Sequence, residues 1–324
     1  MTSTTLTSTG KLTRAIERPR PLTRVMAWEL RRFRASRLFW LQALGFFCLS
    51  SFMIWARQIP LTLNHMQANV LFLGYVAGTS AWGLLMILPS GTLMLLGLLL
   101  PFVNADGVTR DLHRHTHELL MATALPIRAY VWGRYLAGLV MSLGLALLLL
   151  AAILGMGLFL HLTVADYPAP EIGIVLLLWV GMIVSATIVV SSLSFALGTL
   201  LPRLATLVKT VILLAWFVGV EIISIELGDA SHAANFSLPA WYINWDPTSN
   251  GISLGLFNKY MTDFSNLASK ATSTAQMQHG ILTVENSLID LAGWFAPHLL
   301  LAGLSLLLVL VAALAFKRSR EVLN

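Results

Sequence analysis

The chain has little cysteine and little charge, and both shortages restrict what it can be. A single cysteine, Cys48, stands among 324 residues, so neither an intrachain disulfide nor a cysteine-based metal cage can form. Charged residues make up 11% of the sequence and hydrophobic residues 57%, a balance that soluble domains do not show. The composition therefore predicts an integral membrane protein.

Motifs of nucleotide hydrolysis and of metal-dependent hydrolysis are also missing. The sequence contains no Gly-x-x-x-x-Gly-Lys-Ser/Thr run, so it has no phosphate-binding loop and no ATPase site of its own. No His-Glu-x-x-His or Cys-x-x-Cys motif occurs either. We therefore expect no catalytic residues and no bound metal in this chain.

Six long apolar runs are present, separated by more polar segments. Each is near or above the roughly 17 to 25 residues that an α-helix needs to cross a bilayer. The predicted spans are 38–55, 82–103, 130–160, 172–200, 210–225 and 294–316. The sequence therefore predicts an all-α membrane protein with six transmembrane helices.

The positions of the basic residues predict how these spans are oriented. Of 21 Lys and Arg residues, nine precede the first span, three lie between the second and third, and a fourth, Arg134, lies at the start of the third. Two more lie between the fourth and fifth spans, and three follow the last. Cytoplasmic loops retain Lys and Arg, so both termini and these two loops are expected to be cytoplasmic. The net charge of +6 thus reflects topology, and we expect no nucleic-acid partner.

We divide the chain into four parts by composition. They are a disordered cytoplasmic tail (1–21), an interfacial helix (22–37), a six-span transmembrane domain (38–316) and a second cytoplasmic tail (317–324). In the interfacial helix, Val25 and Phe33 mark an apolar side, while Arg24, Arg31 and Arg34 are suited to anionic lipid headgroups. The six-span domain includes a cytoplasmic loop at 104–129 and an outer segment at 227–293.

The loop between the second and third spans carries the most specific motif. It contains a charged stretch from Asp106, then Thr-His-Glu-Leu-Leu-Met-Ala-Thr ending at Thr123, and Gly133 with Arg134 at the start of the third span. This stretch resembles the signature of ABC type-2 transporter membrane subunits. The matching residues are Arg114, Thr116, Glu118, Leu119, Leu120, Ala122, Thr123, Gly133 and Arg134, whereas His115 and Ala124 replace the usual Gly and Pro.

The resemblance implies a fold, a function and a set of partners. It implies a permease of the type V ABC exporter class, in which two six-span halves, identical or different, pair in the lipid bilayer. Each half is seated on a separate ABC ATPase subunit, which binds the ATP and magnesium, so this chain needs no cofactor of its own. The expected location is a bacterial plasma membrane.

Charged residues of the loop are the candidates for coupling to that ATPase. A short amphipathic helix of mixed charge suits docking in a groove on a soluble partner. The candidate coupling residues are Asp106, Arg110, Asp111, Arg114, Thr116 and Glu118. Within the spans, Glu221 is a carboxylate at a costly depth, and Pro89 permits a helix kink, so both are candidates for the translocation pathway.

Other functions remain open at this level. A mechanical or scaffold subunit that passes no substrate would share all of these features. A secondary transporter would need ion-coupling residues in several spans. An intramembrane enzyme would need catalytic polar residues clustered at one depth. His113, His115 and His117 could also form a metal-binding loop. Trp241, Tyr242 and Trp245 are typical of an anchor at the outer membrane interface.

Overall fold

The computed structural model describes residues 21–56, 78–88, 94–105, 126–164, 167–223, 238–256, 263, 266 and 292–321. Within these ranges every regular element is a helix, so the predicted all-α class is confirmed. By length and composition, four described helices could cross a membrane: Arg37–Ala56, Ile127–Thr163, Ile172–Leu200 and Gly293–Phe316. The chain is thus a multi-pass integral membrane protein.

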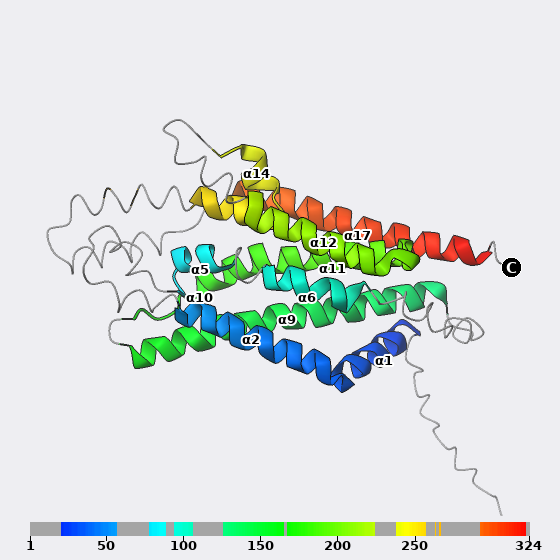
Figure 1. Cartoon of the computed structure of the whole chain (residues 1–324), viewed down its shortest axis with the longest axis horizontal. Helices are drawn as coiled ribbons and strands as arrows, with labels where there is room; N and C mark the ends of the chain where they lie inside the picture. Colours follow the sequence, from blue (N-terminus) through cyan, green and yellow to red (C-terminus); the bar gives the residue numbers. More distant parts are fainter. Residues whose placement is uncertain are drawn as a thin grey trace, which may run out of the picture.

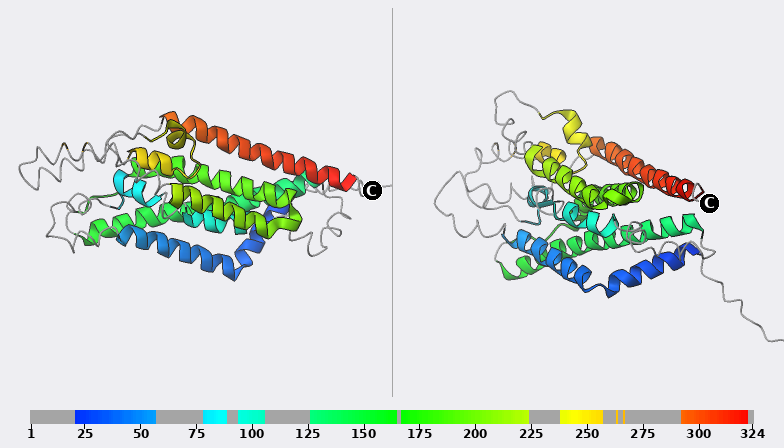
Figure 2. Two further views of the ribbon diagram at one scale, coloured as in Figure 1. Left: turned by 45° about the horizontal axis from the view of Figure 1, so that its top comes forward. Right: turned by 45° about the vertical axis from the view of Figure 1, so that its right-hand side comes forward.

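The helices form an elongated bundle with most axes along its length (Figures 1 and 2). In chain order the described elements are α1 Pro21–Ala35, α2 Arg37–Ala56, α5 Ala81–Ile87, α6 Met94–Asn104, α9 Ile127–Thr163, α10 Ile172–Leu178, η2 Trp179–Val184, α11 Ser185–Leu200, η3 Pro202–Leu204, α12 Ala205–Phe217, η4 Val218–Ile222, α14 Ala240–Trp245 and α17 Ala292–Glu321. Helix α1, the start of α9 and the end of α17 lie at one end, which we call the α1 end. Helices α5 and α14 lie toward the other, the α14 end.

Helix α9 runs through the middle of the bundle and packs on α1, α2, α6 and α11. Its buried positions carry mainly apolar or small residues, among them Leu145, Leu149 and Ile153, and these join one large core cluster with residues of α2, α5, α6, α10, α11 and α12. Helix α11 packs along both α17 and α6. Without a hydrophobic force between helices in lipid, such contacts depend on close packing of small residues.

The corner between α1 and α2 follows from local hydrogen bonding at Ser36. This residue lies between the two helices, and its side-chain oxygen accepts a hydrogen bond from the Phe39 backbone N–H at 3.3 Å. The indole N–H of Trp40 donates to the Arg34 carbonyl oxygen at 2.9 Å, and the rings of Phe33 and Phe39 pack at 5.8 Å. These contacts turn the chain sharply from the basic α1 into the apolar α2 (Figure 1).

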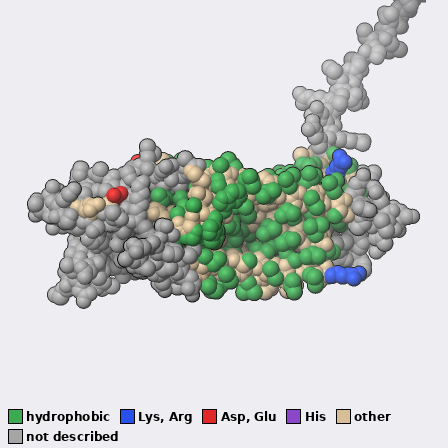
Figure 3. Space-filling model, turned by 90° about the horizontal axis from the view of Figure 1, so that it is seen from above, with side chains coloured by type: hydrophobic (Ala, Val, Ile, Leu, Met, Phe, Trp, Pro, Cys, Tyr) green, Lys and Arg blue, Asp and Glu red, His purple; other side chains and the backbone are tan. Residues whose placement is uncertain are grey.

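Charge and apolar surface are separated along the bundle. Every Lys and Arg whose side chain the structure describes lies in α1, at the start of α2, in the first two turns of α9, or between Leu200 and the first turns of α12. Figure 3 shows Lys and Arg at the α1 end, a broad hydrophobic belt, and acidic side chains at the opposite end. This distribution is that of a protein whose belt lies in lipid.

Two of the predicted spans differ in detail from the structure. The predicted second span, 82–103, is described only in part, as α5 and α6, and the residues 89–93 between them lie outside the described ranges. The fifth begins earlier than predicted, since α12 starts at Ala205 and continues as the π-helix η4, so Lys209 lies within a helix and not in a loop. A π-helical turn, η2, also interrupts the fourth span.

Candidate functional site

Most predicted site residues fall outside the residues that the structure describes. This applies to the candidate coupling residues Asp106, Arg110, Asp111, Arg114, Thr116 and Glu118, and equally to Pro89 and the three loop histidines. The backbone of Glu221 lies in η4, and its side chain is not described. The site can therefore be built only from the helices that enter and leave the loop.

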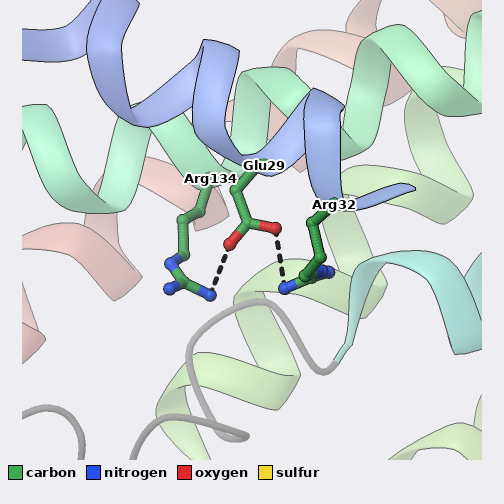
Figure 4. A network of polar contacts seen from close by, with 3 residues as sticks. All are labelled: Glu29, Arg32 and Arg134. Carbon is green, nitrogen blue, oxygen red and sulfur yellow. Dashed lines mark ion pairs between the residues drawn. The ribbon is translucent and has the colours of Figure 1, made fainter. Parts of the chain in front are cut away.

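A charged cluster fastens α1 to the first turns of α9, the helix that leaves the loop (Figure 4). Glu29 of α1 makes two ion pairs, each with a nitrogen–oxygen distance of 2.7 Å, to Arg134 of α9 and to Arg32 of α1. The side chains of Glu29 and Arg134 are 3% and 1% exposed, whereas that of Arg32 is 30% exposed. The pair between the two helices is therefore almost completely removed from solvent.

The surroundings of Arg134 explain how a guanidinium can be held there. Its terminal carbon lies 4.9 Å from the ring centroid of Tyr130 and 5.1 Å from that of Trp28, so the cation lies against two aromatic rings. Arginine stacks on aromatic rings and is more weakly hydrated than lysine, which lowers the cost of burial. The Tyr130 ring also stacks on Phe316 of α17, with centroids 6.2 Å apart. The cluster thus links three helices.

Gly133 allows the close approach of α1 that this ion pair requires. A Cβ atom at this position would lie 2.8 Å from two side-chain carbons of Val25 and 3.2 Å from the Leu22 carbonyl oxygen. Any larger residue would push α1 away from α9. The Gly133–Arg134 pair therefore has two physical roles here, since the glycine admits α1 and the arginine binds it.

Gly133 and Arg134 belong to the motif found in the sequence, but the motif does not indicate that Glu29 is their partner. A signal was present: Glu29 is the only acid of α1, and it lies four residues after Val25, on the apolar side of the helix. An acid on the buried side of an arginine-rich helix needs a cation nearby. The sequence did not indicate which arginine supplies it.

The other flank of the loop is held by polar contacts at the end of α6. The Asn104 side-chain amide nitrogen donates to the Ser142 hydroxyl of α9 at 2.9 Å and to the Leu100 carbonyl oxygen at 3.0 Å. Ala105 packs its carbonyl group directly against Gly198 of α11. Both residues that lead into the loop are therefore fixed to neighbouring helices.

At the α14 end, the segment after α14 is folded around Asp246. The Asp246 carboxylate accepts hydrogen bonds from the backbone N–H groups of Thr248, Asn250 and Gly251, each at 2.9 Å, and from the Thr248 hydroxyl at 2.7 Å. The Asp246 carbonyl oxygen lies 2.9 Å from Nε2 of His298 in α17, which requires a proton on that nitrogen. This anchors α14 to α17.

The predicted aromatic anchor divides into two parts in the structure. Trp241 and Trp245 are 64% and 45% exposed, as a membrane-interface anchor requires, but Tyr242 is 2% exposed and belongs to the packing of the protein. The three residues occupy one short helix, so successive positions point to different sides. Only the two tryptophans are available to lipid.

One pattern after α14 has the spelling of a hydrolase motif, Gly-x-Ser-x-Gly, at 251–255. In hydrolases this motif forms a sharp turn from strand to helix that exposes the serine. Here the backbone is helical through these residues, Ser253 is 5% exposed, and its hydroxyl donates to the Leu85 carbonyl oxygen of α5. The serine therefore holds this segment against α5.

Comparison with known proteins adds no assignment. No protein-family model matches the chain, and no curated protein sequence is significantly similar to it.

Proposed function

We propose that this chain is the six-span permease subunit of an ATP-driven ABC transporter of the type V exporter class. The observation that carries the proposal is the motif between Asp106 and Arg134, together with its position between two helices that are fastened to the bundle. One flank is held by Asn104 and Ala105, and the other by the Glu29–Arg134 ion pair. Force applied to the loop would therefore reach several membrane helices at once.

The arrangement of the helices supports six crossings. Besides the four long apolar helices, α5 with α6 and α12 with η4 run along the same axis of the bundle (Figure 1). Helix α12 with η4 forms a continuous helical backbone from 205 to 223, about 28 Å at 1.5 Å per residue, which is close to the thickness of the hydrocarbon layer. With six crossings both termini lie on one side, and we assign the basic α1 end to the cytoplasm.

In the proposed mechanism, the chain transmits motion and performs no chemistry. A separate nucleotide-binding subunit binds ATP and magnesium and docks on the loop through charged residues such as Arg114 and Glu118. Its closure moves the loop, and α9 carries the movement into the bundle because α1 and α6 are both fixed to it. A second six-span subunit, identical or different, completes the pathway.

Purification from native membranes tests this function. The chain, solubilised in mild detergent, should copurify with a second polypeptide that carries a phosphate-binding loop, and the pair should hydrolyse ATP. The chain alone should not hydrolyse ATP, because it has no such loop. ATPase activity from the purified chain by itself would overturn the proposal.

A matched variant makes the same experiment specific for the loop. Glu118→Ala removes one charge of the proposed docking surface, and the loss of one partner from a partly buried charged contact commonly costs about 2 to 5 kcal/mol. We expect less copurified ATPase, or hydrolysis that no longer responds to substrate, with unchanged membrane insertion. Arg31→Ala, on the exposed side of α1, is the control and should behave as the unmodified chain. Equal ATPase recovery and coupling in both variants would remove Glu118 from the docking surface.

The topology gives an independent prediction. In a Cys48→Ser background, Arg203→Cys should be protected from an impermeant maleimide in intact cells, and Lys259→Cys should be labelled. Arg203 lies in η3 at the α1 end, and Lys259 follows the helical segment that ends at 256. Labelling of the Arg203→Cys variant from outside would contradict the assigned orientation.

A further inference from the structure

A half-enclosed cavity of about 400 Å³ lies between α11, α12 with η4, and the short helix α14. Ligand-binding cavities commonly measure about 300 to 1,000 Å³, so this one can hold a small molecule or part of a larger one. Among the residues whose side chains the structure describes, its lining contains none of the predicted site residues. Its occupant is therefore a question separate from the coupling of ATP hydrolysis to transport.

The lining of the cavity is almost wholly apolar. Val190 and Leu193 of α11 form one wall, Ala215 and Trp216 of α12 form another, and Trp241 and Trp245 of α14 cover it. Aliphatic walls offer an occupant dispersion contacts and little hydrogen bonding. The cavity therefore suits an apolar chain.

The polar groups at the rim of the cavity already form hydrogen bonds within the protein. Asp246 and Thr248 border the cavity, but both oxygens of the Asp246 carboxylate already accept hydrogen bonds from Thr248, Asn250 and Gly251. A charged or strongly polar ligand would have to displace these bonds and would gain few in exchange. The rim thus excludes such ligands from the interior.

The opening of the cavity is continuous with the lipid-facing surface. Ala215, which lines it, is exposed, and Val211 at its edge is 52% exposed, so both reach the apolar outer surface of the bundle. The exposed rings of Trp241 and Trp245 lie over it at the α14 end, in the place that tryptophan takes near lipid headgroups. A molecule can therefore enter sideways from the bilayer, beneath α14.

We propose that this cavity is a lipid-binding site that holds one acyl chain of a bilayer lipid, with the headgroup beside α14. Three observations together indicate this occupant. The walls are apolar, the polar groups at the rim already form hydrogen bonds, and the cavity opens toward the lipid. Helix α14 is a fixed cover, since the His298 contact holds its end on α17 and the Asp246 carboxylate orders the segment that follows it. The bound lipid would wedge between α11 and α12, so its presence would stabilise this half of the bundle.

Photolabelling tests the site with a defined probe. The purified full chain is placed in nanodiscs that contain phosphatidylcholine with a diazirine at the middle of one acyl chain, and labelled residues are identified by mass spectrometry. Trp216 is only 8% exposed, yet it lines the cavity, so an acyl chain bound there should label it. Lipids with a diazirine on the headgroup should label Trp241 and spare Trp216.

A cavity-filling variant and a matched control make the result decisive. In Ala215→Phe the added ring occupies the cavity, and labelling of Trp216 should be lost, while labelling of Leu307 on the exposed surface of α17 is retained. Ala151→Phe makes the same change at an exposed position of α9 and should leave the Trp216 label intact. The proposal is overturned if Trp216 takes no acyl label, or if Ala215→Phe and Ala151→Phe label it equally. Retained Leu307 labelling shows that each variant is inserted in the bilayer, and an unchanged unfolding transition shows that it is folded.

Discussion

Replacing Glu29 with alanine should lower the free energy of unfolding by about 3 to 5 kcal/mol, the largest stability effect that we expect from a single side chain. The change removes the carboxylate that Arg134 and Arg32 both contact at 2.7 Å. Arg134 then loses this carboxylate while its guanidinium stays buried, since its side chain is 1% exposed and lies against two aromatic rings. Most of the cost comes from removing a partner of a buried charge and not from the net strength of the ion pair.

Equilibrium unfolding of the detergent-solubilised chain by dodecyl sulfate, followed by far-ultraviolet circular dichroism, measures this effect. Arg31→Ala is the matched control, because Arg31 is exposed on the same helix, and its change should stay within about 0.5 kcal/mol. The double variant Glu29→Met with Arg134→Met should regain most of the lost stability, since apolar residues often replace a buried ion pair without net cost. If Glu29→Ala and Arg31→Ala unfold alike, the ion pair does not hold α1 on α9.

The helical class and the course of the chain could be predicted from composition and apolar run length alone. Helices α2, α9 and α17 each contain the predicted apolar run, because a long run in lipid has to satisfy its backbone hydrogen bonds internally. The ends of the helices were less predictable. Helix α9 begins at Ile127 and ends at Thr163, since polar flanking residues continue a helix once it has formed, and α12 extends to Ala205 for the same reason.

Contacts between distant segments could not be predicted from one sequence. The Glu29–Arg134 pair joins helices that are far apart in the chain, and periodicity says only that Glu29 lies on the apolar side of its own helix. The burial of Tyr242 between two exposed tryptophans is a similar case, because it depends on how α14 meets its neighbours. The candidate coupling residues, by contrast, were found through a local motif, and they stay a prediction.

The close contact between α6 and α11 leads to the second large prediction, which concerns Gly198. A Cβ atom there would meet the Ala105 carbonyl oxygen at an impossible distance and would lie 3.1 Å from the Ala105 Cα and carbonyl carbon. These are backbone atoms, so the clash cannot be relieved by rotating a side chain. Gly198→Ala should therefore destabilise the protein by about 1 to 3 kcal/mol, as overpacking does in other cores.

Gly198→Ala should change the stability in the direction opposite to most glycine-to-alanine replacements in helices. In an open helix interior, replacing glycine with alanine usually stabilises by about 0.5 to 1 kcal/mol. Gly144→Ala is the matched control, because nothing lies within 4 Å of the added Cβ, and it should raise the stability of the chain while Gly198→Ala lowers it. The same unfolding assay measures both.

Because Ala105 is the last described residue before the loop at 106–125, displacement of α6 by Gly198→Ala should also reduce ATPase recovery in the purification experiment. Stabilisation by both alanines would show that α6 and α11 are not in close contact at Gly198, and that the loop is not held there.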